Sequence, residues 1–276
     1  KVNADIESKI IDEYKSVFNG FSVDLTEQEA LELKEISLVK NVYRNEEVKA
    51  LLEESVNQIN ADELWKLKDG NDNLITGKGV TIGIIDTGVD YTHDDLGGCL
   101  GETCKVIDGY DFVNEDNDPK DDHGHGTHVA ATAAGNGILK GVAPDAKIVA
   151  YKVLDSGGSG SWSDVVQSIE RSVDPNQDGD FSDHLDIISL SLGGFGNPDD
   201  PVSKAIDNAV REGVIAVIAA GNSGPHEQSI GSPGTARKAI TIGAVNKCDS
   251  IAGFSSRGPV SWENGILLKP DLAAPG

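Results

Sequence analysis

The sequence has 276 residues, 38% of them hydrophobic, and 46 acidic against 23 basic residues give it a formal net charge of -23. This length suits one large globular domain, alone or with a small companion. The negative charge argues against nucleic acid and anionic membrane surfaces as partners and favours divalent cations. The apolar runs are shorter than the ~20 residues that span a bilayer, and the first residues lack the apolar core of a secretion signal.

The two ends and the cysteines suggest where the chain comes from. It begins at Lys1, contains no methionine and finishes in the turn-like sequence KPDLAAPG, so we expect a fragment at both ends. Cys99 and Cys104 bracket a short loop that can close a disulfide if it turns tightly, whereas Cys248 has no obvious mate. Three free thiols are the alternative. A disulfide predicts an oxidising compartment, and hence a secreted or extracellular protein.

The first 50 residues predict a small β-α-β module. Residues 16–25 alternate between apolar and polar, residues 26–36 have helical spacing of their apolar side chains, and residues 38–48 are typical of a short strand. An acidic, linker-like stretch follows at 46–56. We therefore divide the chain into a small α+β domain at 1–50 and a second domain at 51–276.

The second domain has the pattern of a parallel α/β sheet. Its continuous apolar runs indicate strands that are buried on both faces, and the helical stretches between them are the crossovers. The predicted strands are residues 80–86, 147–154, 185–192, 213–220 and 239–245, and the predicted crossover helices are residues 163–173 and 201–213.

Polar residues follow three of these segments, and functional groups in open α/β sheets lie at the carboxyl ends of strands. Asp86 ends the first strand, where a buried carboxylate needs a partner such as histidine, although a turn cap is the alternative. DDHGHGTHVA places three histidines at the start of a helix, whose amino terminus favours the neutral ring of a base. His125, between two glycines, is the candidate base, and His128 is expected to be a packed, hydrogen-bonded core residue. Asn222 could donate to an oxyanion or be an ordinary turn residue.

Two other hydrolytic chemistries fit the same residues less well. Asp86 begins an Asp-Thr-Gly sequence, but aspartic peptidases need two carboxylates that share a proton, and this sequence occurs once. The H-x-H-x-x-H pattern of the histidine segment lacks the i, i+4 pair that zinc peptidases carry on one helix face. Both interpretations are therefore disfavoured.

The segments IIDTGVDYTHDDL, DDHGHGTHVAAT and AAGNSG, in this order, resemble those of the subtilisin-like serine peptidases. The resemblance runs from about residue 60 to residue 276 and implies a three-layer α/β/α fold. It implies that Asp86 orients the imidazole, that His125 is the general base and that Asn222 stabilises the oxyanion. Residues 1–50 resemble the carboxyl-terminal part of the family's inhibitory propeptide, which makes the propeptide itself an expected partner. The residues that match the family's edges for an extended peptide substrate are Ser159, Gly160, Ser191, Leu192 and Gly193.

The family's nucleophile is missing from the sequence. It lies in a Gly-Thr-Ser-Met-Ala-like segment, and no Gly-Thr-Ser tripeptide occurs here. Gly234-Thr235-Ala236 runs directly into a predicted strand instead of opening a helix, so we reject it. The expected function is secreted serine endopeptidase, with the nucleophile outside these residues and the 276-residue chain itself inactive. The alternatives are a peptide-binding protein of this fold without catalysis and a calcium-dependent structural domain.

An acidic loop, DPNQDGDFSDHLD at 174–186, predicts a calcium site. Its oxygen-bearing side chains occupy alternate positions, as in the first half of an EF-hand loop. The twelfth position is Leu185 instead of glutamate, so Asp183 or Asp186 would have to complete the shell. Hard oxygen ligands favour Ca²⁺, and a solvated acidic loop is the alternative. The predicted ligands are Asp174, Asn176, Asp178, Asp180 and Asp183.

Overall fold

A computed structural model of the chain describes residues 9–14, 20–42 and 52–276. The chain divides into two compact units, Lys1–Ala50 and Leu51–Gly276. None of the helices in the described part of the chain is long and apolar enough to cross a membrane.

The small unit contains two antiparallel strands and a helix. Strand β1 (Ile10–Tyr14) pairs with β2 (Gly20–Val23), and helix α2 (Glu27–Lys34) follows. The helix begins after Thr26, whose hydroxyl accepts from the Glu29 amide while the Glu29 carboxylate accepts from the Thr26 amide, a reciprocal capping box. The expected helix is confirmed, the expected strand at 16–25 is confirmed for residues 20–23, and β1 was not foreseen. The strand expected at 38–48 is wrong for residues 38–42, which form no strand, and its remainder lies outside the described residues.

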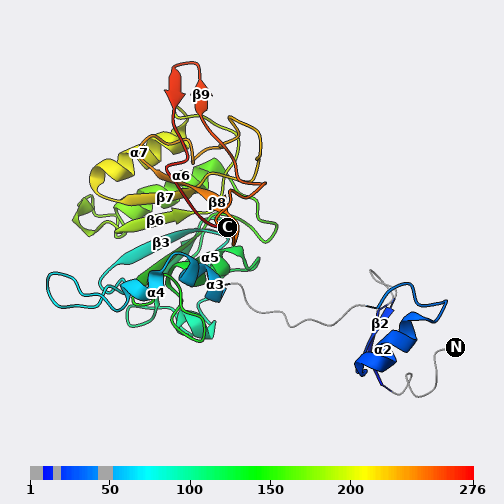
Figure 1. Ribbon diagram of the computed structural model, residues 1–276. Helices are drawn as coiled ribbons and strands as arrows, with labels where there is room; N and C mark the ends of the chain where they lie inside the picture. The colour runs from blue at the N-terminus through cyan, green and yellow to red at the C-terminus, as the bar shows by residue number, and fades with distance from the viewer. Residues whose placement is uncertain (1–8, 15–19, 43–51) are drawn as a thin grey trace. The chain divides into compact units, whose positions relative to one another are not determined.

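The larger unit is built on a seven-stranded sheet in which every neighbouring pair is parallel (Figure 1). The strand order is β11-β8-β7-β6-β3-β5-β4. The strands are β3 (Thr81–Asp86), β4 (Val106–Asp111), β5 (Lys147–Lys152), β6 (Ile187–Leu190), β7 (Ile215–Ala219), β8 (Ile240–Val245) and β11 (Leu272–Pro275). A separate hairpin is formed by β9 (Val260–Trp262) and β10 (Gly265–Leu267).

All five predicted strands of the sheet are present, and two strands of the sheet, β4 and β11, were not foreseen, nor was the β9/β10 hairpin. The sequence KPDLAAPG, expected to be a turn, forms β11, because residues 272–275 pair with residues 242–245 of β8. A proline is tolerated there because β11 is the edge strand of the sheet. Strand β4, at the opposite edge, was missed because its residues include two aspartates and a glycine and do not form a continuous apolar run.

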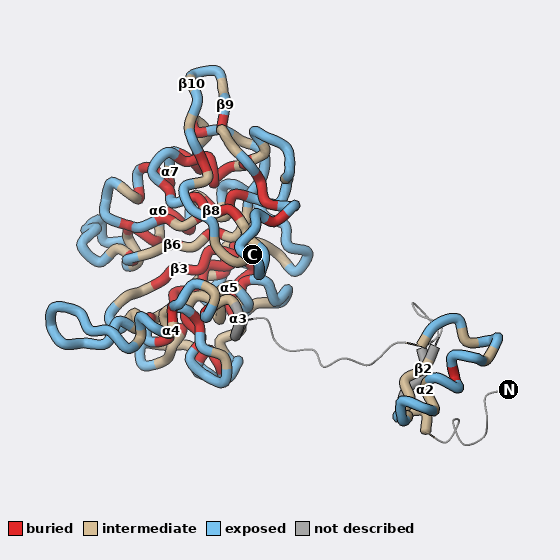
Figure 2. Tube along the Cα trace, viewed as in Figure 1, coloured by how far each residue is buried: buried red, intermediate tan, exposed pale blue. Residues whose placement is uncertain are grey.

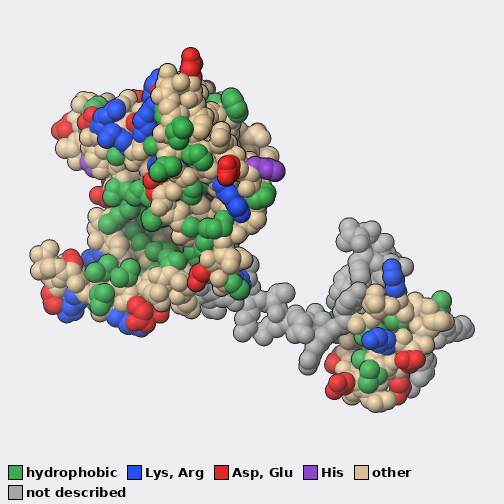
Figure 3. Space-filling view, turned by 45° about the horizontal axis from the view of Figure 1, so that its top comes forward, with side chains coloured by type: hydrophobic (Ala, Val, Ile, Leu, Met, Phe, Trp, Pro, Cys, Tyr) green, Lys and Arg blue, Asp and Glu red, His purple; other side chains and the backbone are tan. Residues whose placement is uncertain are grey.

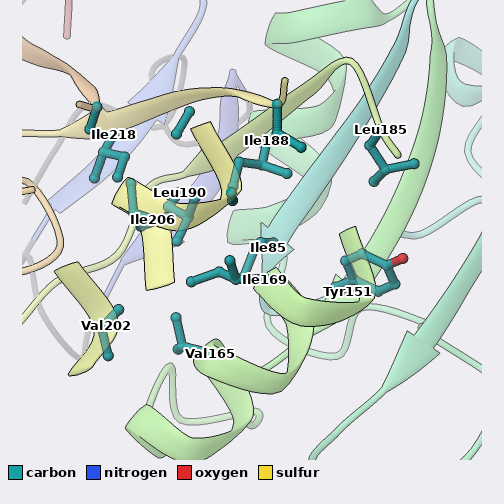
Figure 4. Close-up of a cluster of buried hydrophobic side chains, with 14 of the residues drawn as sticks. Ile85, Tyr151, Val165, Ile169, Leu185, Ile188, Leu190, Val202, Ile206 and Ile218 are labelled. Carbon is teal, nitrogen blue, oxygen red and sulfur yellow. The ribbon is translucent and has the colours of Figure 1, made fainter. Parts of the chain in front are cut away.

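Helices cover both faces of the sheet (Figure 1). On one face, α6 (Trp162–Val173) and α7 (Pro201–Glu212) pack over β5, β6 and β7, and on the other face α5 (His125–Ala134) packs over β3 and β5. Successive residues of β3 show the two layers, since Ile85 belongs to the α6/α7 cluster and Ile84 to the α5 cluster. Figure 4 shows the first cluster. The α/β fold class is confirmed.

The buried positions follow these layers (Figure 2), but the α5 face is covered only in part by described residues. Ile215 of β7, Ile240 of β8 and Leu272 of β11 lie on that face, and each is more than one-third exposed. The space-filling view shows hydrophobic side chains gathered around a hollow of this unit (Figure 3).

Two short helices and a disulfide complete the larger unit. Helices α3 (Leu52–Gln58) and α4 (Ala61–Leu64) precede the sheet. Cys99 and Cys104 lie between the 3₁₀ turn η1 (Asp94–Leu96) and β4, and their sulfur atoms are bonded. Cys248 is exposed and free.

Candidate active site

The candidate site lies where the order of strands in the sheet reverses. Strand β3 has β5 and β4 on one side and β6, β7, β8 and β11 on the other. The carboxyl ends of β3 and β6 meet at this reversal, which is where open α/β sheets bind ligands. Asp86 is the last residue of β3, and Ser191, Leu192 and Gly193 directly follow β6.

Asp86 and His125 form a hydrogen-bonded pair. Helix α5 begins at His125, after Gly124 has turned the chain with a left-handed φ of 100°. The ring atom Nδ1 of His125 lies 2.7 Å from Oδ1 of Asp86, which is fully buried. The Thr87 amide donates to the same Oδ1, also at 2.7 Å. The other carboxylate atom, Oδ2, is buried and has no hydrogen-bond partner among the described residues. This carboxylate can therefore hold Nδ1 in its protonated form.

The electrostatic environment raises the pKa of His125. The largest cause is the hydrogen bond to Asp86, partial burial of the ring acts in the opposite direction, and the negative charges of Asp86 and Asp121 add to the rise. The helix amino terminus was expected to disfavour the charged ring, whereas the net shift of the His125 pKa is upward. The hydrogen bond to a buried carboxylate at 2.7 Å is its largest cause.

Asp121, which the sequence pattern did not single out, shapes the start of α5. Its carboxylate accepts hydrogen bonds from the hydroxyl of Thr87, from the amide and hydroxyl of Thr127, and from the amides of His123 and Gly124. Burial raises the pKa of Asp121, but these bonds outweigh it and hold the pKa below the ordinary aspartate value. Asp121 is therefore the ionised centre around which the segment before α5 is folded.

Gly126 lets α5 approach the end of β3. Its amide donates to the Thr87 hydroxyl at 2.9 Å. A Cβ atom at this position would collide with the carbonyl oxygen of Gly88 and lie 3.2 Å from the Asp86 side chain. The glycine therefore allows the close approach that brings His125 to Asp86.

The other two histidines have different positions. His123 is exposed, accepts a hydrogen bond from the His125 amide at 3.4 Å, and has its ring centroid 6.4 Å from that of His125. His128 is exposed, so the expectation that it packs in the core is wrong. The buried residues of α5 are Gly126, Ala130 and Ala134, which share one face of the helix, and residue 128 lies away from that face.

Two cavities extend from this pair. The first, of about 550 Å³, is lined by His125 together with Leu154, Trp162 and Val165. Its lining also includes all five residues expected to bind substrate: Ser159, Gly160, Ser191, Leu192 and Gly193. The second, of about 800 Å³, shares residues 191–194 with the first and is also lined by Asn222 and Trp262. His125 and Asn222 thus belong to two cavities that residues 191–194 join. Among the described residues lining either cavity there is no aspartate, glutamate, lysine or arginine.

Asn222 is exposed and lies just beyond β7, in a segment that is anchored on both sides. The Gly221 carbonyl accepts from the Ser256 amide at 2.9 Å, and the Ser223 amide donates to the Ser256 hydroxyl at 3.0 Å. Thr235 and Ala236, by contrast, are fully buried just before β8. The rejection of 234–236 as a nucleophile segment therefore stands.

The acidic loop does not form a metal cage in this structure. Its carboxylates accept amide hydrogens of the loop itself: Asp174 binds the amides of Asp178 and Gly179, and Asp178 binds that of Asp180. No group of three or more histidine, cysteine, aspartate or glutamate side chains in the described residues converges as a metal site. The oxygen donors have the right chemistry for Ca²⁺.

Comparison with known proteins identifies relatives of both parts of the chain. Residues 77–276 match the family model described as Subtilase family, and residues 1–51 match the model described as Peptidase inhibitor I9. The chain is 42% identical over 271 residues to the minor extracellular protease Vpr of Bacillus subtilis strain 168. The aligned region covers 88% of this chain and 31% of Vpr.

Two further similarities agree with these. The chain is 39% identical over 261 residues to the serine protease AprX of the same strain, with 88% of this chain and 56% of AprX covered. The crystal structure of a cold adapted subtilisin-like serine proteinase aligns with a TM-score of 0.60 and 32% identity, over 78% of this chain and 71% of that one. The chain thus spans less than two thirds of the length of either Bacillus protease.

Proposed function

The chain belongs to the subtilase family, and we propose that it supplies the acid–base pair, the oxyanion donor and the peptide-binding groove of a serine endopeptidase. The observation that carries the proposal is the Asp86–His125 hydrogen bond of 2.7 Å, made at the sheet's reversal point by a ring that lines a 550 Å³ cavity. The uncharged groove and the segments 157–161 and 191–194 that line it suit an extended peptide, which can add to an edge as a strand.

In the proposed reaction His125 takes the proton of a serine hydroxyl as that oxygen attacks the peptide carbonyl, and later gives the proton to the leaving amine. Asp86 holds Nδ1 protonated, which leaves Nε2 as the accepting atom, and its buried charge stabilises the imidazolium ion that forms. Asn222 would donate its side-chain amide to the developing oxyanion. Because the sequence contains no Gly-Thr-Ser tripeptide, we place the nucleophile outside these 276 residues.

The test compares His125→Ala with His128→Ala in a longer form of the protein that hydrolyses peptides. His128 lies on the same helix, is exposed and is outside the cavities, so it is a matched control. Loss of the base is expected to lower kcat by about 10⁶-fold, whereas His128→Ala should stay within about twofold. Activity that survives His125→Ala would contradict the proposal.

The second candidate is a peptide-binding protein of the same fold without catalysis, which would use the same groove, lined by no aspartate, glutamate, lysine or arginine among the described residues. The two candidates differ in what happens to a bound peptide. In the second, a longer form binds an extended peptide, binding is weakened by Gly193→Val in the groove, and no cleavage product appears.

The small unit is proposed to be an inhibitory propeptide, with the domain boundary at residues 50/51. The Peptidase inhibitor I9 match at 1–51 supports this proposal. Secretion is proposed from the disulfide between Cys99 and Cys104 and from the similarity to an extracellular protease. An active form that lacks residues 1–50 should be inhibited by a separate 1–50 peptide, and a form that the peptide does not affect would contradict the propeptide assignment.

We further propose that Asp174, Asn176, Asp178, Asp180 and Asp183 bind Ca²⁺, which would have to displace the loop's own amide hydrogen bonds or use the remaining carboxylate oxygens. The alternating oxygen donors support this proposal. Calcium should raise Tm in the chain, and Asp178→Asn should abolish the rise while Asp108→Asn, at an exposed position on β4, should retain it. An equal rise in the two variants would contradict it.

A further inference from the structure

Lys152 is a buried cation beside the candidate site that the proposed reaction does not use. It is the last residue of β5, and its side chain is 1% exposed. The ammonium group donates to the carbonyl oxygens of Thr87 at 2.9 Å and Leu154 at 2.8 Å, and to Oδ1 of Asp122 at 2.6 Å. A lysine has three donor hydrogens, so these acceptors use all of them. Such burial costs several kcal/mol unless the charge is paired in this way.

The three acceptors belong to three different parts of the site. Thr87 directly follows Asp86, Asp122 lies in the segment before α5, and Leu154 lines the 550 Å³ cavity. The ammonium group of Lys152 therefore connects the end of β3, the segment that precedes His125, and Leu154 in the wall of the first cavity.

Thr87 links the Lys152 hydrogen bonds to the Asp86–His125 pair. Its amide donates to Oδ1 of Asp86, the same atom that holds Nδ1 of His125. Its hydroxyl accepts from the Gly126 amide, in the first turn of α5. A displacement of Thr87 would therefore disturb both the acceptor of the His125 hydrogen bond and the start of the helix that carries the ring.

We propose that Lys152 is a positioning residue that sets the Asp86–His125 hydrogen bond by fixing Thr87, Asp122 and Leu154 relative to one another. Its importance for catalysis rests on the proposed function, whereas the geometry that it controls can be measured in the chain without catalysis.

A positioning role and the loss of a positive charge alone predict opposite shifts in the pKa of His125 when Lys152 is replaced by methionine. The charged groups that act on His125 are Asp86 and Asp121, Lys152 is paired with Asp122 in the segment before α5, and the His123 ring lies beside that of His125. Loss of the positive charge alone would raise the pKa of His125. Loss of the three Lys152 hydrogen bonds would weaken the hydrogen bond between Asp86 and His125. Because that bond is the largest cause of the raised pKa of His125, the pKa would fall.

The experiment is an NMR titration of the His125 ring in the 276-residue chain, with the Nδ1–H resonance as a second readout. Lys269→Met is the matched control, because Lys269 is also buried and donates to the Ala239 carbonyl and to Asp271. Lys269 precedes β11, which is separated from β5 by four strands, or roughly 24 Å of sheet.

In Lys152→Met the pKa of His125 should fall and the Nδ1–H resonance should broaden or vanish, whereas Lys269→Met should leave both unchanged. Lys152→Arg, which keeps the charge but puts a larger, planar guanidinium in the place of the compact ammonium group, should also lower the pKa of His125. An unchanged or raised pKa in Lys152→Met would overturn the proposal. So would unfolding of both Lys152 variants while Lys269→Met stays folded, because Lys152 would then serve the fold as a whole.

Activity gives a separate readout in a longer form that hydrolyses peptides. Misplacement of the pair by Lys152→Met should lower kcat by about a hundredfold, with a smaller change in KM. If the His125 titration behaves as expected but the longer wild-type protein hydrolyses no peptide, the proposed function fails and the positioning role stands.

Discussion

Replacing Asp86 by asparagine removes the charge from the candidate site while keeping the shape of the side chain. With its amide nitrogen in the place of Oδ1, the new side chain faces the Thr87 amide and drives His125 to the tautomer protonated on Nε2, which cannot accept the serine proton. With the nitrogen in the place of Oδ2, the NH₂ group is buried where the carboxylate oxygen has no hydrogen-bond partner among the described residues. Both orientations lose the carboxylate that stabilises imidazolium.

The expected loss in kcat for Asp86→Asn is about 10⁴-fold, because the tautomer and the charge are changed together. This factor corresponds to about 5.5 kcal/mol of transition-state stabilisation at 1.36 kcal/mol per tenfold change. KM should change much less, since Asp86 is fully buried and lines neither cavity.

The pH dependence of peptide hydrolysis is a second, independent test of the same pair. The base works when neutral, so wild-type activity should fall as the pH drops through the pKa of His125, which the hydrogen bond to Asp86 raises above the ordinary histidine value. Because the hydrogen bond to Asp86 is the largest cause of that rise, the acid limb of the residual activity in Asp86→Asn should move to lower pH.

The assay is peptide hydrolysis by a longer, active form, measured as kcat/KM from pH 5 to pH 10, with circular dichroism to confirm that the variant is folded. A folded Asp86→Asn variant with kcat within tenfold of wild type, or with an acid limb that stays in place, would refute the assignment of Asp86 and His125 as an acid–base pair.

Three further predictions concern the rest of the site and its frame. Asn222→Ala should lower kcat by about 10²- to 10³-fold with little change in KM, and a loss confined to KM would contradict the oxyanion role. Gly126→Ala, whose Cβ would meet the Gly88 carbonyl, should lower Tm and weaken the His125 Nδ1–H signal, and an unchanged Tm would show that the close approach is not needed. Replacing both Cys99 and Cys104 by serine should cost about 2 kcal/mol in the free energy of unfolding, because their loop is short, and denaturant melts that coincide with wild type would contradict this.

The sequence predicted the inner strands of the sheet because each of them is a short, uninterrupted apolar run. It missed β4 and β11, which lie at the two edges. At an edge, pairing of the backbone with one neighbour is enough to form a strand. The pattern of apolar and polar side chains therefore says little about whether such a strand forms. The residues 272–275 contain a proline and still pair with β8 over four positions.

Asp86 was predicted at the site because the carboxyl ends of parallel strands converge. The groove residues came from the resemblance to the subtilisin-like peptidases, and they line the cavity that contains the His125 ring. The sequence could not find Thr87, Asp121 or Lys152, because their importance comes from hydrogen bonds between segments that are 30 or more positions apart in the chain. A lysine that ends a buried strand was the available signal, since an unpaired ammonium group would be too costly there.

The direction of the His125 pKa shift was wrong for a related reason. The helix terminus is visible in the sequence, but the 2.7 Å contact with a buried carboxylate is a product of the fold. His128 was misplaced because small residues made every position of α5 look suitable for burial, whereas the buried face consists of Gly126, Ala130 and Ala134.

The most direct test of the central claim uses a serine-directed phosphonate on a longer form of the protein that contains this chain. If His125 activates a serine, one serine outside residues 1–276 should be labelled in the wild type, and labelling should be lost in His125→Ala but kept in His128→Ala. Labelling that is unchanged in His125→Ala would contradict the claim that Asp86 and His125 are the acid–base pair of a serine peptidase.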